Sequence, residues 1–323
     1  MSDPIDGTWN DIGEGCHAYI QRSGGWGWSN AGLILGDGAS LLVDTLFDNR
    51  LTAAMLQAAA PLTKQSPLGT VVNTHANGDH HFGNAVAAPH GGSVTVIASA
   101  ACAEEMTEVG PEVLASLTAD TTDVGDMFRA LFGEFNFEDV QLRLPDRTFS
   151  DRLELVVGGR QVDLVELGPA HTQGDVVVHV PDTATVFTGD LLFNGGTPIV
   201  WAGPLSNWVA ACDAIIAMAP EVVVPGHGAL ATLDAVRDAR EYLVWVESSA
   251  TQAHAAGIDP WDAAQQLAGE LSGTSGSWDQ RGEFGRLAAN VEAVYLELDP
   301  SAQRSDLVTL FRHMATLEGN LFT

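Results

Sequence analysis

One short segment constrains this chain more than any other. Residues 74–84 read T-H-A-N-G-D-H-H-F-G-N and directly follow the apolar run 68–73, which has the length and composition of a short buried strand. Imidazole nitrogens and carboxylate oxygens are ligands that divalent zinc, iron and manganese accept, and a loop at a strand end can direct several of them to one point. The segment therefore predicts a metal site with His75, Asp79 and His80; the alternative is a polar loop with three unrelated histidines.

Three further residues with metal-binding side chains occur in equally distinctive settings. His171 lies in G-P-A-H-T-Q-G-D, Asp190 in F-T-G-D and His227 in P-G-H-G, each at the end of an apolar strand pattern. Ligands at the ends of several strands make a rigid site. We therefore expect these three residues to join the 74–84 segment in one site.

Together, the four motifs resemble those of the metallo-β-lactamase fold superfamily, in particular its glyoxalase-II-like metallo-hydrolase branch. The resemblance runs from about residue 16 to residue 228, and the family signature H-x-H-x-D-H aligns with His75, Asn77, Asp79 and His80. It implies an α+β fold, a four-layer αββα sandwich of two mixed sheets packed face to face with helices outside. The metal site would lie at one edge of the sandwich.

The resemblance also implies how the ligands divide between two metals. One metal would take His75, the residue at position 77 and His171; the other would take Asp79, His80 and His227; Asp190 would bridge them. This chain has Asn77 where the family has its second histidine, and an amide oxygen is a weaker ligand than imidazole. We therefore expect a filled second site and a weak first site, or one that holds a water bound by Asn77.

The expected cofactor is zinc, one or two ions per chain, with iron or manganese as alternatives. Lactamases of the superfamily that have asparagine at a first-site histidine position work with one zinc in the other site. The leading function is a metal-dependent hydrolase that uses metal-bound hydroxide on a small-molecule ester, thioester, lactone or similar electrophile. Asp79 and Asp190 would orient the attacking water, and His81 would be either a proton shuttle or a residue that surrounds the ligands.

Three other functions are kept as alternatives. The first is a hydrolytic dehalogenase of an activated aromatic ring, which needs only one metal hydroxide. The second is a mononuclear iron dioxygenase of the same superfamily, which would use His75, His171 and Asp190. The third is a non-catalytic binding protein, which the retention of six ligand-type residues makes less attractive.

The amino-acid composition limits the kinds of molecule that the protein is expected to bind. With 42 acidic and 14 basic residues, the formal net charge is −28, which repels nucleic acid and anionic membrane surfaces and leaves a small molecule as the expected partner. No apolar run reaches 18 residues, and the acidic N-terminus has no signal-peptide pattern. Cys16, Cys102 and Cys212 lie far apart, which suits buried thiols in a reducing compartment. We expect a cytoplasmic protein.

The chain divides into a catalytic domain over residues 1–230 and a C-terminal helical region over 231–323. A helical insertion at about 101–140 interrupts the first part and accounts for the long separation between His80 and His171. The Gly/Ser stretch 272–277 predicts a flexible linker. Arg286, Asn290 and Tyr295 resemble residues of the helical tails of bacterial metallo-hydrolases, which cap the pocket or support a homodimer.

Periodicity and turn residues predict the individual elements. Strands are expected over 17–21, 31–35, 41–44, 68–73, 93–98, 152–157, 161–167, 176–180, 185–187 and 221–224. Helices are expected over 50–60, 85–88, 101–108, 111–118, 126–135, 206–218, 233–255, 260–271, 284–298 and 301–317.

Several side chains are expected around the metal opening. Trp26, Trp28, Phe82 and Trp201 either line the pocket or close the core, and the phenylalanines of the insertion form its packed face or a lid. Asp44 is expected to hold the His75 loop, and Thr172 and Asp175 to orient the His171 loop.

Overall fold

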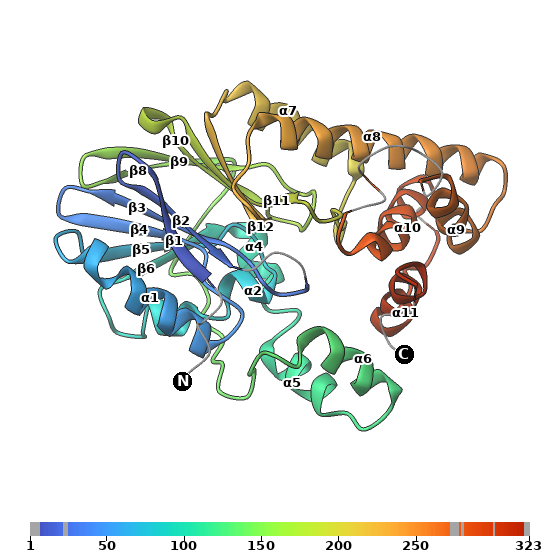
Figure 1. Ribbon diagram of the computed structural model, residues 1–323, viewed down its shortest axis with the longest axis horizontal. Coiled ribbons are helices and arrows are strands. Elements are labelled where there is room, and N and C mark those ends of the chain that lie inside the picture. Colours follow the sequence, from blue (N-terminus) through green and yellow to red (C-terminus); the bar gives the residue numbers. More distant parts are fainter. Residues whose placement is uncertain (1–6, 22–24, 272–277, 279–280, 300, 320–323) are drawn as a thin grey trace.

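The computed structural model describes residues 7–21, 25–271, 278, 281–299 and 301–319 of the 323 residues. Two β-sheets lie face to face, and helices cover their outer faces (Figure 1). The αββα architecture predicted from the sequence is confirmed. The expected linker over 272–277 lies outside the described residues.

The first sheet has seven strands in the order of the chain. Strands β1 to β4 pair antiparallel, and β4 to β7 pair parallel, so the sheet is mixed. The strands are β1 (Gly7–Gly13), β2 (Cys16–Gln21), β3 (Ala31–Gly36), β4 (Ala39–Val43), β5 (Leu68–Val72), β6 (Thr95–Ser99) and β7 (Arg147–Phe149).

The second sheet has five strands in the order β12-β11-β10-β9-β8. Only the β11–β12 pair is parallel. The strands are β8 (Arg152–Val157), β9 (Arg160–Glu166), β10 (Val176–Val180), β11 (Thr185–Asn194) and β12 (Val222–Gly228).

The space between the sheets is filled by small and β-branched apolar side chains from both of them. Ile34 and Val72 of the first sheet belong to the same buried cluster as Val162 and Val178 of the second. The sheets approach closely at the end of β3, where a Cβ atom on Gly36 would stand 1.9 Å from the carbonyl oxygen of Val157. Glycine at this position permits that approach.

Helices on the outer faces bury one apolar side each. Helix α1 (Asn49–Thr63) buries Leu51, Met55 and Ala59, spaced four residues apart, against the first sheet. Helices α7 (Leu205–Ala217) and α8 (Leu233–Ala255) cover the second sheet and both contact β11 (Figure 1).

Two helical segments extend the sandwich. Helices α4 (Ala100–Glu105), α5 (Pro111–Ala119) and α6 (Asp123–Phe132) lie between β6 and β7 in the chain, as the predicted insertion does. The C-terminal part contains α9 (Pro260–Leu271), η3 (Phe284–Arg286), α10 (Leu287–Leu298) and α11 (Leu307–Leu317). The remaining elements are the short α2 (Gly78–His81), α3 (Asn84–Ala87) and η1 (Pro181–Thr183).

Some predicted boundaries were wrong. Strand β11 does not end at residue 187 but continues through Asp190 to Asn194, because pairing with β12 resumes after an irregular stretch that breaks the apolar pattern. Helix α1 continues past the predicted stop before Pro61, which costs one hydrogen bond in the last turn only. Strand β1 was missed because its half-exposed residues show no clear alternation.

Two further expectations concern single residues and long helices. All three cysteines are buried free thiols, as predicted. Within the described part of the chain, none of the helices has both the length and the apolar composition needed to cross a membrane.

The close contact between the sheets generates a stability prediction. Gly36→Ala is expected to lower the free energy of unfolding by about 1–3 kcal/mol, because the new methyl group must push the sheets apart. Gly69→Ala is the matched control in β5, where the nearest atom to the added Cβ is 3.9 Å away. Urea unfolding monitored by circular dichroism measures both, and equal stabilities for the two variants would contradict the packing argument.

Candidate metal centre

The first candidate ligands lie on the loop that joins β5 to α2. Asp44, directly after β4, fixes this loop: Oδ1 accepts from the backbone N of Thr74, and Oδ2 accepts from the Thr74 hydroxyl, both at 2.7 Å. The carbonyl oxygen of His80 accepts from the side-chain amide of Asn73 at 3.0 Å. The predicted role of Asp44 in holding the loop is confirmed.

Each of the four candidate histidine ligands has its Nδ1 atom in a hydrogen bond. The partners are Thr74 Oγ1 for His75 (3.0 Å), Asp44 Oδ2 for His80 (2.9 Å), the Ile199 carbonyl for His171 (2.7 Å) and the Trp28 carbonyl for His227 (3.1 Å). Carbonyl and carboxylate oxygens accept, and the Thr74 hydroxyl already donates to Asp44, so Nδ1 carries the proton in each ring. The Nε2 atoms are therefore the positions at which a metal would bind.

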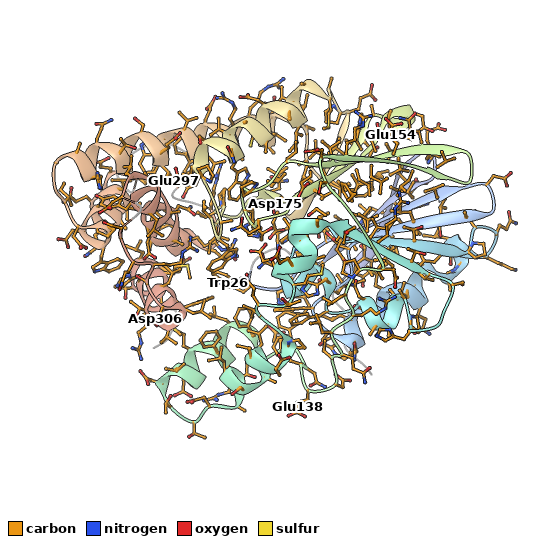
Figure 2. The ribbon with its side chains drawn as sticks, turned by 180° about the vertical axis from the view of Figure 1, so that it is seen from behind. Trp26, Glu138, Glu154, Asp175, Glu297 and Asp306 are labelled. Carbon is orange, nitrogen blue, oxygen red and sulfur yellow. The ribbon has the colours of Figure 1, made fainter. Side chains whose placement is uncertain are left out.

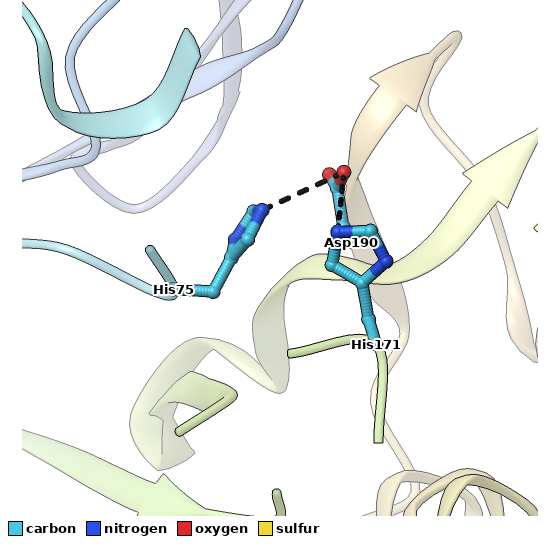
Figure 3. A group of neighbouring side chains, drawn as sticks. All are labelled: His75, His171 and Asp190. Atoms are coloured by element: carbon cyan, nitrogen blue, oxygen red, sulfur yellow. Dashed lines mark ion pairs between the residues drawn. The ribbon is translucent and has the colours of Figure 1, made fainter. Parts of the chain in front are cut away.

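These Nε2 atoms converge on Asp190. Its Oδ2 lies 3.6 Å from Nε2 of His75, 3.4 Å from that of His171 and 3.3 Å from that of His227, and its Oδ1 lies 3.2 Å from Nε2 of His80. Figure 3 shows the imidazoles of His75 and His171 directed at the Asp190 carboxylate.

Asp79 completes a second group of ligands. Its Oδ2 lies 3.3 Å from Nε2 of His227 and 3.6 Å from Nε2 of His80, and these two Nε2 atoms are 3.4 Å apart. The side chains thus form two adjacent clusters, and Asp190, a member of the first, also contacts His80 and His227 of the second. One consists of His75, His171 and Asp190, and the other of Asp79, His80 and His227.

An irregularity in β11 directs Asp190 into this site. Gly189 pairs with Pro225 and Phe193 pairs with His227. Between these two pairs β11 contains more residues than β12, so β11 bulges out of the regular ladder. A Cβ atom on Gly226 would stand 1.9 Å from Asp190 Oδ1, so only glycine leaves room for the carboxylate. The motif P-G-H-G of β12 thus supplies the ligand His227 and, through Gly226, leaves room for the Asp190 carboxylate of β11.

The residues present fit a divalent cation. Two ligands of a tetrahedral ion with bonds of about 2.0 Å stand about 3.3 Å apart, which matches the separations of 3.2–3.6 Å given above. Among the described residues, His75 Nε2 and Asp190 Oδ1 are buried with no hydrogen-bond partner. Buried polar atoms without partners are costly, and a cation would satisfy both.

The electrostatics lead to the same conclusion. Burial lowers the pKa of His227, but the Asp190 and Asp79 carboxylates outweigh burial and raise it to about 9. Burial would raise the pKa of Asp190, yet the imidazoles of His227, His80 and His75 hold it well below its usual range. A divalent cation would supply the positive charge that protonated histidines otherwise provide, and its binding would release those protons.

Asn77 faces the first cluster. Its side-chain oxygen Oδ1 lies 2.6 Å from His171 Nε2, which is too close for both atoms to be ligands of one tetrahedral ion. Burial lowers the pKa of His171 to about 4, so the ring is neutral, and its Nδ1 proton is directed at Ile199. Nε2 is then an acceptor, so the contact is a hydrogen bond when the Asn77 amide is turned by 180°, which puts its NH2 group in the place of Oδ1 as the donor. In this arrangement Asn77 occupies the lone pair that a first-site metal would need.

His81 lies away from the ligands. Its ring is fully buried, Nε2 is 3.1 Å from the Ala76 carbonyl, and burial lowers its pKa to about 4. It does not line the cavity described below. This placement supports a role in holding the ligand loop and gives no support to the predicted proton shuttle.

A cavity of about 340 Å³ opens over the ligands. Its polar floor is formed by Asn77, Asp79, His171, Asp190 and His227. The insertion and the C-terminal helices contribute walls, and Figure 2 shows Trp26 where these segments meet the sandwich.

The aromatic residues expected near the opening divide into two groups. Trp26, Phe82 and Trp201 line the cavity, whereas Trp28 does not and packs against Phe135 at a ring distance of 4.9 Å. Of the insertion, Phe128 and Phe132 are both buried and part of the lining.

Sequence analysis missed part of the lining. Phe311 and Arg304 of the C-terminal segment line the cavity, and Phe311 lies 5.1 Å from Trp26 and 5.3 Å from Phe128 between ring centres. No local signal marks Phe311, because its spacing in α11 is that of any packed helix face. Arg286, which the sequence assigned to the tail motif, also lines the cavity.

The profile of the Metallo-beta-lactamase superfamily matches residues 24–227, well over half of the chain. The chain belongs to this superfamily. The superfamily predicted from the four motifs is therefore confirmed, while the glyoxalase-II-like branch stays a prediction.

Two characterised relatives share part of the sequence. The alpha subunit of 2,4-dinitroanisole O-demethylase from Nocardioides sp. (strain JS1661) is 24% identical over 201 residues, 60% of this chain and 51% of that protein. An acyl-coenzyme A thioesterase from Bos taurus is 29% identical over 94 residues, 27% of this chain and 33% of that protein. The chain thus matches about half of the first relative and a third of the second.

Solved structures share the superfamily fold. The stereoselective inverting sec-alkylsulfatase from Pseudomonas sp. superposes with a TM-score of 0.71 at 18% identity, covering 92% of this chain and 51% of that one. A metallo-beta-lactamase from Pontibacter korlensis gives a TM-score of 0.56 at 20% identity, covering 74% and 99%. At these identities the likeness concerns the fold alone.

The hydrogen bonds of Asp44 generate a prediction about metal affinity in this superfamily member. Asp44→Asn keeps the size of the side chain and tolerates its left-handed backbone (φ 61°), but weakens the bond to His80 Nδ1. We expect metal affinity to fall about 10- to 100-fold, measured by competition with a chromogenic chelator. Asp163→Asn, a buried aspartate of β9, is the matched control. Equal affinities in the two variants would exclude a positioning role for Asp44.

The contact between Asn77 and His171 generates a second prediction. Asn77→His is expected to raise the metal content toward two ions per chain, because an imidazole ligand replaces an amide that occupies His171 Nε2. Elemental analysis of protein loaded with excess metal and then desalted measures this. Asn207→His on the exposed surface of α7 controls for an added histidine. An unchanged stoichiometry would disprove the weak first site.

Proposed function

We propose that this chain is a metal-dependent hydrolase of small-molecule substrates. The observation that supports it most strongly is the position of Asp190, whose Oδ2 lies within 3.3–3.6 Å of the Nε2 atoms of His75, His171 and His227. A divalent cation held there would supply Lewis acidity: it would lower the pKa of water to near neutrality and polarise an electrophilic centre. Zinc is the proposed cation, held most firmly at the cluster of Asp79, His80, His227 and Asp190.

The chain's own groups have separate tasks in this proposal. Asp79 and Asp190 accept hydrogen bonds from the attacking water and hold it toward the cavity. The aromatic walls exclude bulk water and strengthen every electrostatic interaction on the floor of the cavity. His81 holds the ligand loop and leaves proton transfer to the carboxylates.

The proposed substrates are esters, thioesters, lactones and activated aromatic compounds. The thioesterase and the sulfatase named above carry hydrolytic names, and 2,4-dinitroanisole is an activated aromatic ether. The aromatic lining by Trp26, Phe128 and Phe311 supports an aromatic or otherwise flat apolar substrate. Hydrolytic dehalogenation of such a ring fits the same site.

An iron dioxygenase is the second candidate. His75, His171 and Asp190 form a cluster of two histidines and one carboxylate, the set that non-haem iron oxygenases use. The contact of Asn77 with His171 Nε2 argues against it, because that nitrogen would be a required ligand.

We also propose the kind of partner, the cellular location and the oligomeric state. A net charge of −28 supports small-molecule partners over nucleic acid or anionic membranes. A cytoplasmic location and a homodimer built on the C-terminal helices are kept as proposals, which cell fractionation and light scattering would test.

The decisive test is metal analysis combined with an activity screen. Protein purified without added metal should contain one to two zinc ions and no visible absorption, and should hydrolyse at least one member of an ester, thioester, lactone and haloaromatic panel. One iron per chain would favour the dioxygenase, and no metal binding would favour a non-catalytic binding protein.

Asp190→Ala should remove the metal and reduce activity at least about 100-fold, more than loss of a residue that only orients a ligand. The matched control is Asp213→Ala, which removes an exposed carboxylate paired with Arg240. An Asp190→Ala protein that retains both metal and activity would disprove the assignment of the site.

A further inference from the structure

Arg286 is the one buried arginine of the described cavity lining that lies close to the ligands. It ends η3, directly before α10, and 4% of its surface is exposed. It lines the cavity together with Asp190 and His227. None of the steps proposed above uses it.

The guanidinium is incompletely paired for a buried charge. Nη1 donates to the Thr197 carbonyl at 3.0 Å, and the same nitrogen lies 4.0 Å from a carboxylate oxygen of Glu283. Nε is buried and has no hydrogen-bond partner within the described part of the chain, and the same holds for the Thr197 hydroxyl. A buried cation whose N–H groups are only partly paired is costly, and a ligand that accepts from the guanidinium where it lines the cavity would recover part of that cost.

Aromatic rings hold the guanidinium beside the metal ligands. Its Cζ lies 4.3 Å from the Trp26 ring centre and 5.0 Å from that of Phe193. The Phe193 ring in turn stacks on His227, with ring centres 5.1 Å apart and planes 7° from parallel. These contacts limit the movement of Arg286 and place it one aromatic ring away from a candidate ligand.

Away from the candidate ligands, the cavity is small and most of its lining is apolar, with the carboxylates of Glu105 and Glu108 as exceptions. Phe311 contacts Trp26, Phe128 and Phe132 at ring distances of 5.1, 5.3 and 6.4 Å, so one aromatic cluster joins the insertion to α11. A volume of about 340 Å³ is at the lower end for ligand sites and suits a molecule built around a single ring.

We propose that the cavity selects a small carboxylate-bearing molecule with one aromatic ring or a similar apolar body, and that Arg286 binds the carboxylate. The planar guanidinium presents pairs of N–H groups that match the two oxygens of a carboxylate. The apolar body lies among Phe128, Phe132 and Phe311. That this molecule is a substrate rests on the proposed hydrolase function; the binding preference itself does not.

The negative charge of the protein bears on where a carboxylate-bearing ligand can bind. Asp79 and Asp190 on the cavity floor and a net charge of −28 oppose the entry of an anion. An anion therefore binds only where a cation faces it directly. Arg304, which bonds the Trp201 carbonyl at the exposed side of the cavity, is the other arginine of the described lining.

The test uses two inert probes of equal shape, phenylacetate and phenylacetamide. Binding to the metal-loaded protein is measured by titration calorimetry and by intrinsic tryptophan fluorescence, to which Trp26 and Trp201 of the cavity contribute, with metal content determined for every sample. Wild-type protein should bind phenylacetate at least about tenfold tighter than phenylacetamide, a difference of about 1.4 kcal/mol. Because neither probe is hydrolysed by the proposed reaction, the result is independent of whether the chain is a hydrolase.

Three variants separate the sources of the preference. Arg286→Gln should bind the two probes equally, Arg286→Lys should show a reduced preference because it lacks the planar edge, and Arg304→Gln should keep the wild-type preference. A preference that survives Arg286→Gln would assign the anion to the metal instead and overturn the proposal, as would an equal affinity of both probes in the wild type. If Arg286→Gln does not fold, an unchanged preference in Arg286→Lys overturns it equally.

Discussion

The structure depends on an electrostatic constraint at the edge of the sandwich. Two carboxylates and three imidazoles are buried there beside the half-buried His227, with their ligand atoms 3.2–3.6 Å apart, and such a set is stable only when a positive charge joins it. The surrounding elements maintain this arrangement: β4 supplies Asp44, β11 bends to deliver Asp190, and backbone carbonyls of Ile199 and Trp28 orient two rings. The fold therefore holds charged groups together that would otherwise separate.

The helical additions have a different task. Among the described residues, the insertion and the C-terminal helices contribute no member of the two ligand clusters, yet they supply Phe128, Phe132, Arg286 and Phe311 to the cavity. They meet through ring contacts and through an exposed ion pair of 2.8 Å between Arg312 and Asp123. The sandwich thus holds the chemistry and the additions shape what reaches it, the usual division between a fold and the site built on it.

The replacement of a histidine by Asn77 illustrates how one residue changes a shared framework. The side chain of Asn77 takes up the Nε2 atom of His171 in the first cluster, whereas the Nε2 atoms of His80 and His227 in the second cluster face the Asp79 and Asp190 carboxylates. The two clusters are therefore unequal in their readiness for a cation. The asymmetry follows from hydrogen bonding within the protein as much as from the weaker ligand strength of an amide oxygen.

The sequence by itself determined the superfamily, the layered fold and the residues that meet at the site, because motifs at the strand ends and the alternation of short strands and helices are local patterns. Its errors lie where local pattern and pairing disagree: β11 continues through Gly189 and Asp190 because β12 offers hydrogen bonds there. Only the tertiary structure decided that Asn77 contacts His171, that His81 points away from the cavity and that Phe311 and Arg286 reach it. Those outcomes depend on contacts between residues about 90 or more positions apart or on side-chain directions, and neither is encoded in a local run of residues.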